Sequence, residues 1–273
     1  MSALHAPAAR HDDAAPPKIS FAGVEKSYGG RGRGAGTLAL DRFDLAIHRS
    51  EILSIVGPTG CGKSTALNVL AGFEEPSAGT VSVDGRAVAG PGPDRGVVFQ
   101  QAALFPWLTA LANVTLGVKC RGAAREEYEP KAMSLLEEVG LKGFERHYPY
   151  QLSGGMQQRV QIARALMNEP EILLMDEPFG ALDYQTRLLM QKLLLRLWEH
   201  FRPTILFVTH DVGEAIFISD RVIAMTKRPG RVKRELRVET PKPRDYDFLS
   251  STEFKNLERQ LVLAVQSEVD DAA

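Results

Sequence analysis

The sequence predicts an α/β domain that combines a mixed central sheet, an antiparallel β layer and a helical subdomain. Short runs of β-branched residues alternate with longer helical patterns from Ile19 onward, which is typical of a domain with a largely buried sheet. Three runs are almost wholly apolar, as expected of strands covered on both faces, whereas residues 80–83 alternate as a half-exposed antiparallel strand does. Between about residues 102 and 165 this β pattern disappears, which indicates the helical subdomain.

Each element follows from its own pattern. Short β-branched, apolar runs predict strands at residues 19–24, 43–47, 52–56, 80–83, 97–99, 172–175, 205–208 and 222–225. A helix ending near Ala71 is expected after the third strand, and helical patterns also cover residues 128–139, 156–167, 184–200 and 252–269. Segment 184–200 has an apolar face that predicts packing on the sheet, formed by Leu189, Leu193, Leu194 and Leu197.

Both ends of the chain and one internal segment differ from the rest in composition. Residues 1–17 combine mixed charge with many Pro and Ala and lack the apolar run of a secretory signal, so we expect a disordered tail. Residues 29–36 are rich in Gly and Arg and predict a mobile loop. The main domain is expected at residues 18–240, followed by a C-terminal extension, 241–273, that carries a helix.

Composition excludes several classes of protein. The 273 residues include 33 Lys and Arg against 34 Asp and Glu, so the net charge is −1 and no nucleic-acid partner is expected. No apolar run approaches the roughly 18 to 20 residues that a membrane-spanning helix needs. Cys61 and Cys120 lack CxxC or Cys/His spacing, which argues against a disulfide framework or a zinc module and favours a reduced, cytosolic compartment.

The segment GPTGCGKST fits the phosphate-binding pattern G-x-x-x-x-G-K-[ST] and lies between an apolar strand and a helix. Its glycines let successive backbone N–H groups point at one anion, and the helix N-terminus adds partial positive charge. The lysine is expected to reach the outer phosphates of the ligand, and the serine hydroxyl to ligate Mg²⁺. A glycine-rich turn without a ligand is the alternative. The predicted nucleotide-binding residues are Gly57, Pro58, Thr59, Gly60, Cys61 through its backbone, Gly62, Lys63, Ser64 and Thr65.

Two carboxylates, Asp176 and Glu177, follow the apolar strand of EILLMDEP. Burial of such a pair is costly unless a cation or polar ligand lies at this edge of the sheet. Asp176 is predicted to hold Mg²⁺ through water, and Glu177 to orient and partly deprotonate the attacking water. Taken alone, Asp-Glu after a strand is more often a turn or a helix cap. Together with the phosphate-binding loop, the functional interpretation of Asp176 and Glu177 becomes the favoured one.

The segment LSGGMQQR places a hydroxyl and two glycines, Ser153, Gly154 and Gly155, at the start of a helix. This is a second anion-binding helix N-terminus, and it cannot form the pocket of the first loop. A second phosphate-binding surface without a second loop is explained if it closes on the nucleotide of another copy. An ordinary Ser-capped helix is the alternative.

With these residues, the chain resembles the ATP-binding subunit of an ABC (ATP-binding cassette) transporter. LSGGM is similar to the family's signature sequence, and six motifs agree in order over about residues 18–240. The resemblance implies that Tyr28 stacks on adenine and that Gln100 is the Q-loop glutamine near Mg²⁺ and the γ-phosphate. It also implies that Asp183 belongs to the D-loop at the nucleotide and that His210 is the catalytic switch histidine.

Each of these four residues also has a structural reading. Tyr28 could be a core or strand-end aromatic, and Gln100 an ordinary polar residue after Phe99. Asp183 could cap the helix that begins at Tyr184. A satisfied structural histidine is the alternative for His210. Only the family pattern favours the functional readings.

A narrower resemblance is to the nitrate, sulfonate and taurine importer branch. It rests on GPGPDRGVVFQ, LFPWLTALANV, MDEPFGALD and RDYDFLSSTEF. The resemblance implies a peripheral ATPase on the cytoplasmic face of the inner membrane, under a transmembrane permease that a periplasmic or extracellular solute-binding protein supplies. Two copies would bind ATP head to tail, and the solute would be a small oxyanion or sulfonate.

Other classes remain alternatives at this stage. A soluble ABC ATPase that acts on DNA or ribosomes generally carries a second cassette, a coiled-coil insert or a basic surface, and the sequence has none of these. A nucleotide-binding regulator that does not hydrolyse ATP is disfavoured by Glu177 and His210. A cassette of an exporter, or of an importer for another solute, differs only in its partner.

Overall fold

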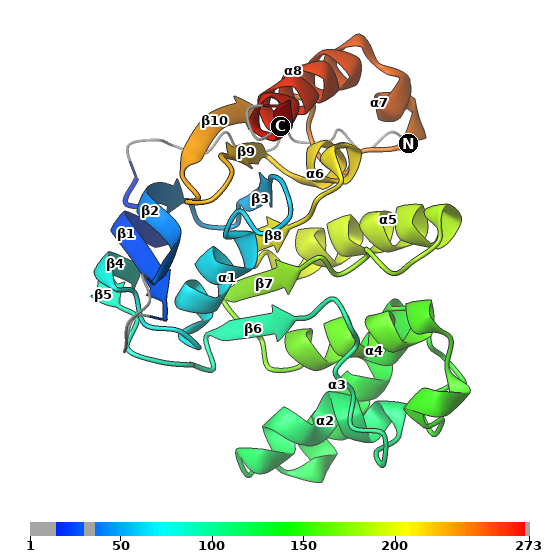
Figure 1. Cartoon of the computed structure of the whole chain (residues 1–273). Helices are drawn as coiled ribbons and strands as arrows, with labels where there is room; N and C mark the ends of the chain where they lie inside the picture. The colour runs from blue at the N-terminus through cyan, green and yellow to red at the C-terminus, as the bar shows by residue number, and fades with distance from the viewer. Residues whose placement is uncertain (1–14, 30–35, 271–273) are drawn as a thin grey trace.

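The computed structural model describes residues 15–29 and 36–270, and its two sheets have the predicted classes. A four-stranded antiparallel sheet has the order β2-β1-β4-β5, and a six-stranded sheet has the order β10-β9-β3-β8-β7-β6. The latter is parallel except where β10 meets β9, so the predicted mixed sheet is confirmed. Figure 1 shows it running from β10 at the top to β6 at the bottom.

The strands are β1 (Ile19–Tyr28), β2 (Thr37–Ile47), β3 (Ile52–Val56), β4 (Ala78–Val83), β5 (Arg86–Ala87), β6 (Arg95–Val98), β7 (Ile172–Asp176), β8 (Thr204–Val208), β9 (Arg221–Met225) and β10 (Val232–Arg237). The helices are α1 (Lys63–Ala71), α2 (Ala110–Cys120), α3 (Arg125–Glu138), the short 3₁₀ turn η1 (Pro149–Gln151), α4 (Gly154–Leu166), α5 (Tyr184–Phe201), α6 (Val212–Ile218), α7 (Tyr246–Ser250) and α8 (Thr252–Asp270). Helices α2 to α4 lie together at the lower right of Figure 1.

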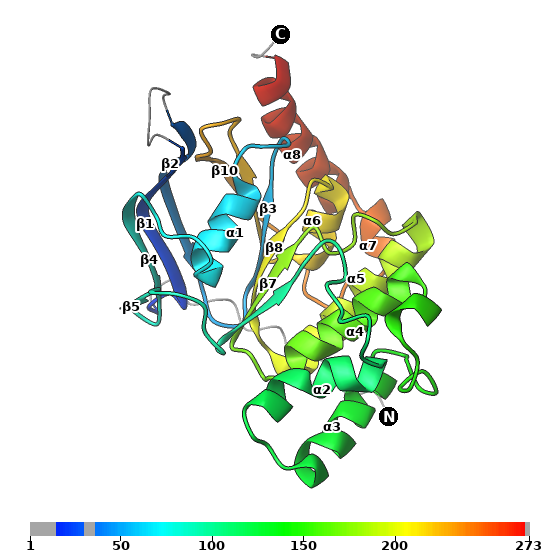
Figure 2. The same cartoon turned by 60° about the horizontal axis from the view of Figure 1, so that its bottom comes forward.

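The central sheet separates two hydrophobic cores. Helix α1 lies between it and the antiparallel sheet (Figure 2), and this core includes Leu53, Leu67 and Leu174. The opposite face packs against α5, α6 and α8, where Leu173 and Met175 are buried. Because side chains alternate along a strand, β7 supplies both cores, which explains its continuous apolar run.

Several elements differ from the predictions. The sequence patterns missed β5 and β10, and β1 and β2 extend further than expected because they pair along most of their length. The predicted strand 97–99 is shifted, since β6 ends at Val98. Helix α5 packs on the sheet as predicted, but Leu189 is not on its buried face and is 52% exposed. The expected tail and glycine-rich loop fall mostly on residues 1–14 and 30–35, outside the described residues.

Two buried cations, Lys242 and Arg244, attach the segment before α7 to the C-terminal end of α6 and to the residues that follow it. Arg244 Nη1 donates to the carbonyls of Ile216 and Phe217, both at 3.0 Å, and of Ser219 at 2.8 Å. These are carbonyls of the last turn and end of α6, which lack intrahelical partners. Lys242 Nζ donates to Asp220 at 2.6 Å, and burial lowers the pKa of Lys242 to about 8. The C-terminal segment thereby holds α6 in place.

Replacing Arg244 by Ala should lower the free energy of unfolding by about 3 kcal/mol, because it leaves several buried carbonyls without a donor. Urea unfolding of the purified protein measures this loss. Arg234→Ala is the matched control: its exposed side chain donates to Gln260 at 2.7 Å, and its removal should cost no more than about 0.5 kcal/mol. Equal losses in the two variants would contradict the assignment of Arg244 as the anchor of α6.

Candidate functional site

The glycine-rich loop between β3 and α1 is shaped by close packing on β2. Gly62 precedes α1 with φ of 109°, and a Cβ atom there would lie 2.8 Å from the carbonyl oxygen of Ala39. Only glycine combines that backbone angle with this approach. The first N–H groups of α1 have no intrahelical acceptors, so the loop presents donors to an anion.

A pocket of about 270 Å³ opens over this loop. Its lining residues come from the loop and from four other segments: Tyr28, Thr37, Ala39, Thr59, Gly60, Gly62, Lys63, Ser64, Thr65, Glu177 and Arg228. Tyr28 is 38% exposed, and its hydroxyl lies 3.5 Å from Thr65 Oγ1, so it is not a core residue. Of this lining, Thr37, Ala39 and Arg228 were not predicted from the sequence.

Two side chains of the loop, Lys63 and Cys61, are buried. Lys63 is 6% exposed, and its ammonium donates to the carbonyls of Gly57 at 2.9 Å and Pro58 at 3.2 Å. Cys61 is buried, and burial raises the pKa of its thiol. The thiol therefore stays protonated, and only the backbone of Cys61 is available to a ligand.

Asp176 and Glu177 diverge at the end of β7, as their adjacent positions predict. Ser64 Oγ donates to Asp176 Oδ1 at 3.0 Å, while Glu177 Oε2 lies 2.9 Å from His210 Nδ1. Burial, reinforced by the charge of Glu177, raises the pKa of Asp176 against the effect of the Ser64 hydrogen bond. The Ser64 hydroxyl and Asp176 carboxylate are hard oxygen donors side by side, so they fit the predicted Mg²⁺.

Gln100 and Glu177 converge on the turn after β7. A Cβ atom on Gly180 would lie 3.6 Å from the Gln100 amide nitrogen and 3.8 Å from Glu177 Oε2. Glu177 itself has φ of 44°, an uncommon backbone conformation that for a non-glycine residue often marks a functional position. The structure therefore brings Gln100, Glu177 and His210 together beside the loop.

Ser153 and Asp183 lie apart from this pocket and cap two helices that touch. The Ser153 hydroxyl accepts from Met156 N at 3.3 Å, and Asp183 Oδ1 accepts from Thr186 N at 3.0 Å. A Cβ atom on Gly155 would approach Thr186 Cγ2 to 2.9 Å, so the starts of α4 and α5 pack closely. The exposed Ser153, Gly154 and Asp183 form an outward-facing surface that does not line the pocket over the loop.

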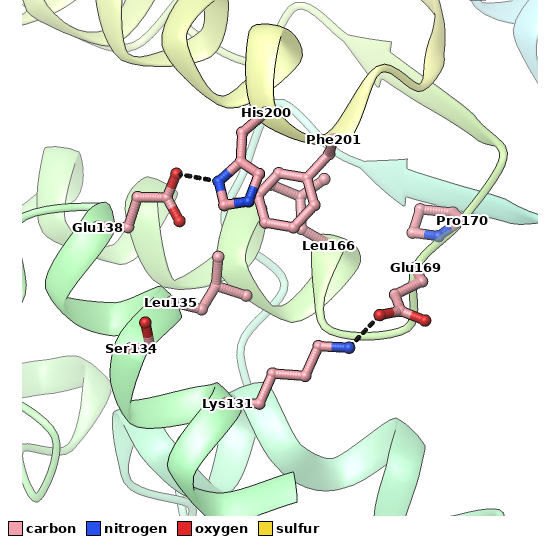
Figure 3. A pocket seen from close by; sticks show the side chains of 9 residues that line it. All are labelled: Lys131, Ser134, Leu135, Glu138, Leu166, Glu169, Pro170, His200 and Phe201. Carbon is pink, nitrogen blue, oxygen red and sulfur yellow. Dashed lines mark hydrogen bonds and ion pairs between the residues drawn. The ribbon is translucent and has the colours of Figure 1, made fainter.

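A second hollow, of about 560 Å³, lies between α3 and the end of α5 (Figure 3). It contains none of the predicted site residues. Lys131 pairs with Glu169, and His200 Nδ1 lies 3.0 Å from Glu138 Oε1 across it. Because these polar groups already face each other, the hollow offers a ligand fewer uncommitted groups than the pocket over the loop.

Comparison with known proteins identifies the family. A family model described as ABC transporter matches residues 40–180. An uncharacterized ABC transporter ATP-binding protein of Methanocaldococcus jannaschii is 49% identical over 85% of this chain and 85% of its own length. The chain belongs to the ABC transporter family. It is an ABC ATPase, as the sequence predicted.

Two import proteins and one solved structure are also similar to this ABC ATPase. The nitrate import ATP-binding protein NrtD of Synechocystis is 45% identical over 82% of the chain and 86% of its own length. The taurine import ATP-binding protein TauB of Rhizobium johnstonii is 51% identical over 71% and 74%. A dimeric post-hydrolysis structure of the cassette MJ0796, bound to ADP and Pi, has a TM-score of 0.71 at 38% identity and covers 82% of the chain and 100% of its own.

The sequence patterns missed a hydrogen-bond network beside His210 that is centred on the buried carboxylate of Glu214. Thr209 Oγ1 donates to Glu214 Oε2 at 2.5 Å, and Gln191 Nε2 donates to Glu214 Oε1 at 3.3 Å. Arg187 of this ABC ATPase links Asp211, at 2.9 Å, to the Leu182 carbonyl, at 3.1 Å. Glutamate three residues after Asp211 in HDVGE is the signature of a helix cap, which hides its burial from sequence reasoning.

Burial raises the pKa of Glu214 from 4.5 to about 7, so the folded protein holds this proton more tightly than the unfolded chain. Its contribution to stability is complete below about pH 4.5 and is lost as the pH rises through 7. The free energy of unfolding should therefore fall, relative to Glu214→Gln, by on the order of 3 kcal/mol between about pH 5 and about pH 8. Urea unfolding at both pH values tests this, and parallel pH profiles of the two proteins would contradict it.

Proposed function

We propose that this chain is the ATP-hydrolysing subunit of an ABC importer, and that two copies bind ATP head to tail. The observation that carries the proposal is the separation of two anion-binding helix starts. One forms the pocket over residues 57–65, while Ser153 and Gly154 are exposed and do not line that pocket. The similarity to a dimeric cassette bound to ADP and Pi supports an arrangement in which each surface completes the site of the other copy.

In the proposed complex, the backbone of the loop and Lys63 bind the phosphates and Tyr28 stacks on adenine. Ser64, Asp176 and Gln100 would hold Mg²⁺, which neutralises the charge that develops on the phosphate oxygens. Ser153, Gly154, Gly155 and Asp183 would contact the nucleotide of the partner copy. Support for these roles comes from the packing of α4 on α5, which presents both helix starts on one surface.

Glu177 is proposed as the general base that takes the proton of the attacking water. His210 Nδ1, 2.9 Å from Glu177 Oε2, fixes the direction of that carboxylate. Closure of the two copies would bring Gln100, Glu177 and His210 around the γ-phosphate, and hydrolysis would reopen them. Because the base and its histidine follow neighbouring strands, their distance does not depend on closure.

The proposed solute is a small oxyanion or sulfonate, first a taurine-like or other alkanesulfonate and then nitrate. Similarity to a nitrate import and a taurine import ATP-binding protein supports this branch. Among the described residues no helix is long and apolar enough to cross a membrane. The proposed partners, by similarity to the import proteins, are permease subunits, which would hold this chain at the cytoplasmic face of the inner membrane and receive solute from a solute-binding protein.

Ser153→Arg should lower the ATPase rate about a hundredfold or more while leaving the nucleotide affinity of the same chain within about twofold. The bulky side chain obstructs the partner's nucleotide without touching the cis pocket. Ser153→Ala is the control for bulk: it removes the hydroxyl, with its cap to Met156 N and its proposed contact to the partner's nucleotide, but adds no obstruction, so its ATPase rate should fall less than that of Ser153→Arg. A loss of affinity comparable to that of Lys63→Ala, which removes the phosphate-binding ammonium, would place Ser153 in the cis pocket and refute the head-to-tail site.

Deleting the gene should abolish growth on an alkanesulfonate as sole sulfur source, or on nitrate as sole nitrogen source, in a strain without a redundant importer. Complementation with the intact gene should restore growth. Complementation with Glu177→Gln should not, because the amide preserves the side-chain shape but cannot act as a base. Unchanged growth of the deletion strain on all these compounds would refute the solute assignment and leave the ATPase assignment intact.

A further inference from the structure

We propose that Arg228 is an additional nucleotide-binding residue, whose guanidinium binds the phosphate chain of a nucleoside di- or triphosphate. It lies in the turn between β9 and β10, more than 150 residues from the glycine-rich loop in the sequence. It nevertheless lines the same pocket as Tyr28 and Lys63. The inference rests on the proposed nucleotide site and adds a contact that no motif assigned.

The turn that carries Arg228 is fixed to the walls of the pocket. Gly230 N donates to the carbonyl of Ala39 at 2.8 Å, and Asp41 N donates to the carbonyl of Gly230 at 3.1 Å. Ala39 itself lines the pocket. A Cβ atom on Gly230 would lie 2.1 Å from the carbonyl oxygen of Cys61, so the turn also packs directly on the phosphate-binding loop.

Bonds within the turn hold its shape. Thr226 Oγ1 donates to the carbonyl of Pro229 at 3.0 Å and accepts from Arg231 N at 2.9 Å. Together with the bonds of Gly230 to β2, these bonds fix the position of the Arg228 backbone relative to the phosphate-binding loop. An arginine on a fixed turn loses less freedom when it binds a ligand than one on an unrestrained loop.

Arg228 differs from the neighbouring cations Arg231 and Lys63 in its hydrogen bonds and ion pairs. Arg231 pairs with Asp41, whereas Arg228 makes no hydrogen bond or ion pair with any residue that the structure describes. The Lys63 ammonium in the same pocket donates to two loop carbonyls. Arg228 is thus an uncommitted cation facing a pocket built from phosphate-binding backbone, and a guanidinium binds phosphate oxygens through two parallel hydrogen bonds.

The test compares the ADP affinities of wild type, Arg228→Ala and Arg231→Ala by isothermal titration calorimetry with Mg²⁺. ADP avoids turnover during the measurement. Arg228→Ala should weaken binding about tenfold, because one charge-assisted contact to phosphate is lost. Arg231→Ala removes the same charge from the same turn but breaks only an exposed ion pair, so its affinity should stay within about twofold of wild type. Arg228→Lys should recover part of the loss.

Further measurements identify the contact. Arg228→Ala should weaken GDP and ADP binding by the same factor, because both share the phosphate chain. A loss confined to ADP would mean a contact to the base and would overturn the phosphate assignment. Equal affinities of Arg228→Ala and wild type, with binding abolished in Lys63→Ala, would overturn the role of Arg228 alone. Wild-type protein that binds no ADP would overturn the nucleotide site together with this inference.

Discussion

Parallel pairing of β3, β8 and β7 is the interaction on which the site depends. In this register Ile55 lies beside Val208, and Val208 beside Asp176, so the three strands end at one edge. Two backbone bonds continue the ladder beyond the strands: Glu177 N donates to Val208 O at 2.8 Å and Thr209 N to Ile55 O at 3.2 Å. The loop, Glu177 and His210 are therefore positioned by one hydrogen-bonded framework.

Burial on both faces makes this framework rigid. Helix α1 and the antiparallel sheet cover one face of the central sheet, and α5, α6 and α8 cover the other (Figure 2). Buried polar groups are consequently held in fixed networks. Arg244 donates hydrogen bonds to carbonyls at the C-terminal end of α6. In the N-terminal half of α6, Glu214 accepts a hydrogen bond from Thr209, the neighbour of His210. The C-terminal extension thus supports a helix that begins directly after the site.

The candidate site combines two regions that favour ligands of opposite charge. Asp176 and Ser64 offer oxygens suited to a divalent cation, whereas Lys63, Arg228 and the start of α1 favour anions. A metal–nucleotide complex carries both kinds of charge. Such a ligand would match both regions of the site, whereas a cation or an anion alone would match only one of them. The pKa of Asp176 is raised mainly by burial, and a bound cation would offset that cost of holding its charge.

The sequence by itself determined the features that depend on local pattern. The glycine-rich loop between a strand and a helix, the buried strand β3 and the packing of α5 on the sheet were predicted because periodicity and backbone constraints act over a few residues. The family followed from motifs whose residues are contiguous in the chain. Among the residues predicted for the site, Gln100, Glu177 and His210 could be named from sequence, but their mutual distances could not.

Only the tertiary structure decided which distant residues meet and which faces are covered. The charged segment VKRELR of β10 forms a strand because β9 supplies its hydrogen-bond partners. Leu189 is exposed because the neighbours that cover α5 do not reach it, although it shares the helical period of the buried leucines. Arg228 and Glu214 show no signal of their role in the sequence. Whether a cation has a charged partner nearby, and whether a carboxylate is buried, is decided only when segments far apart in the chain pack together.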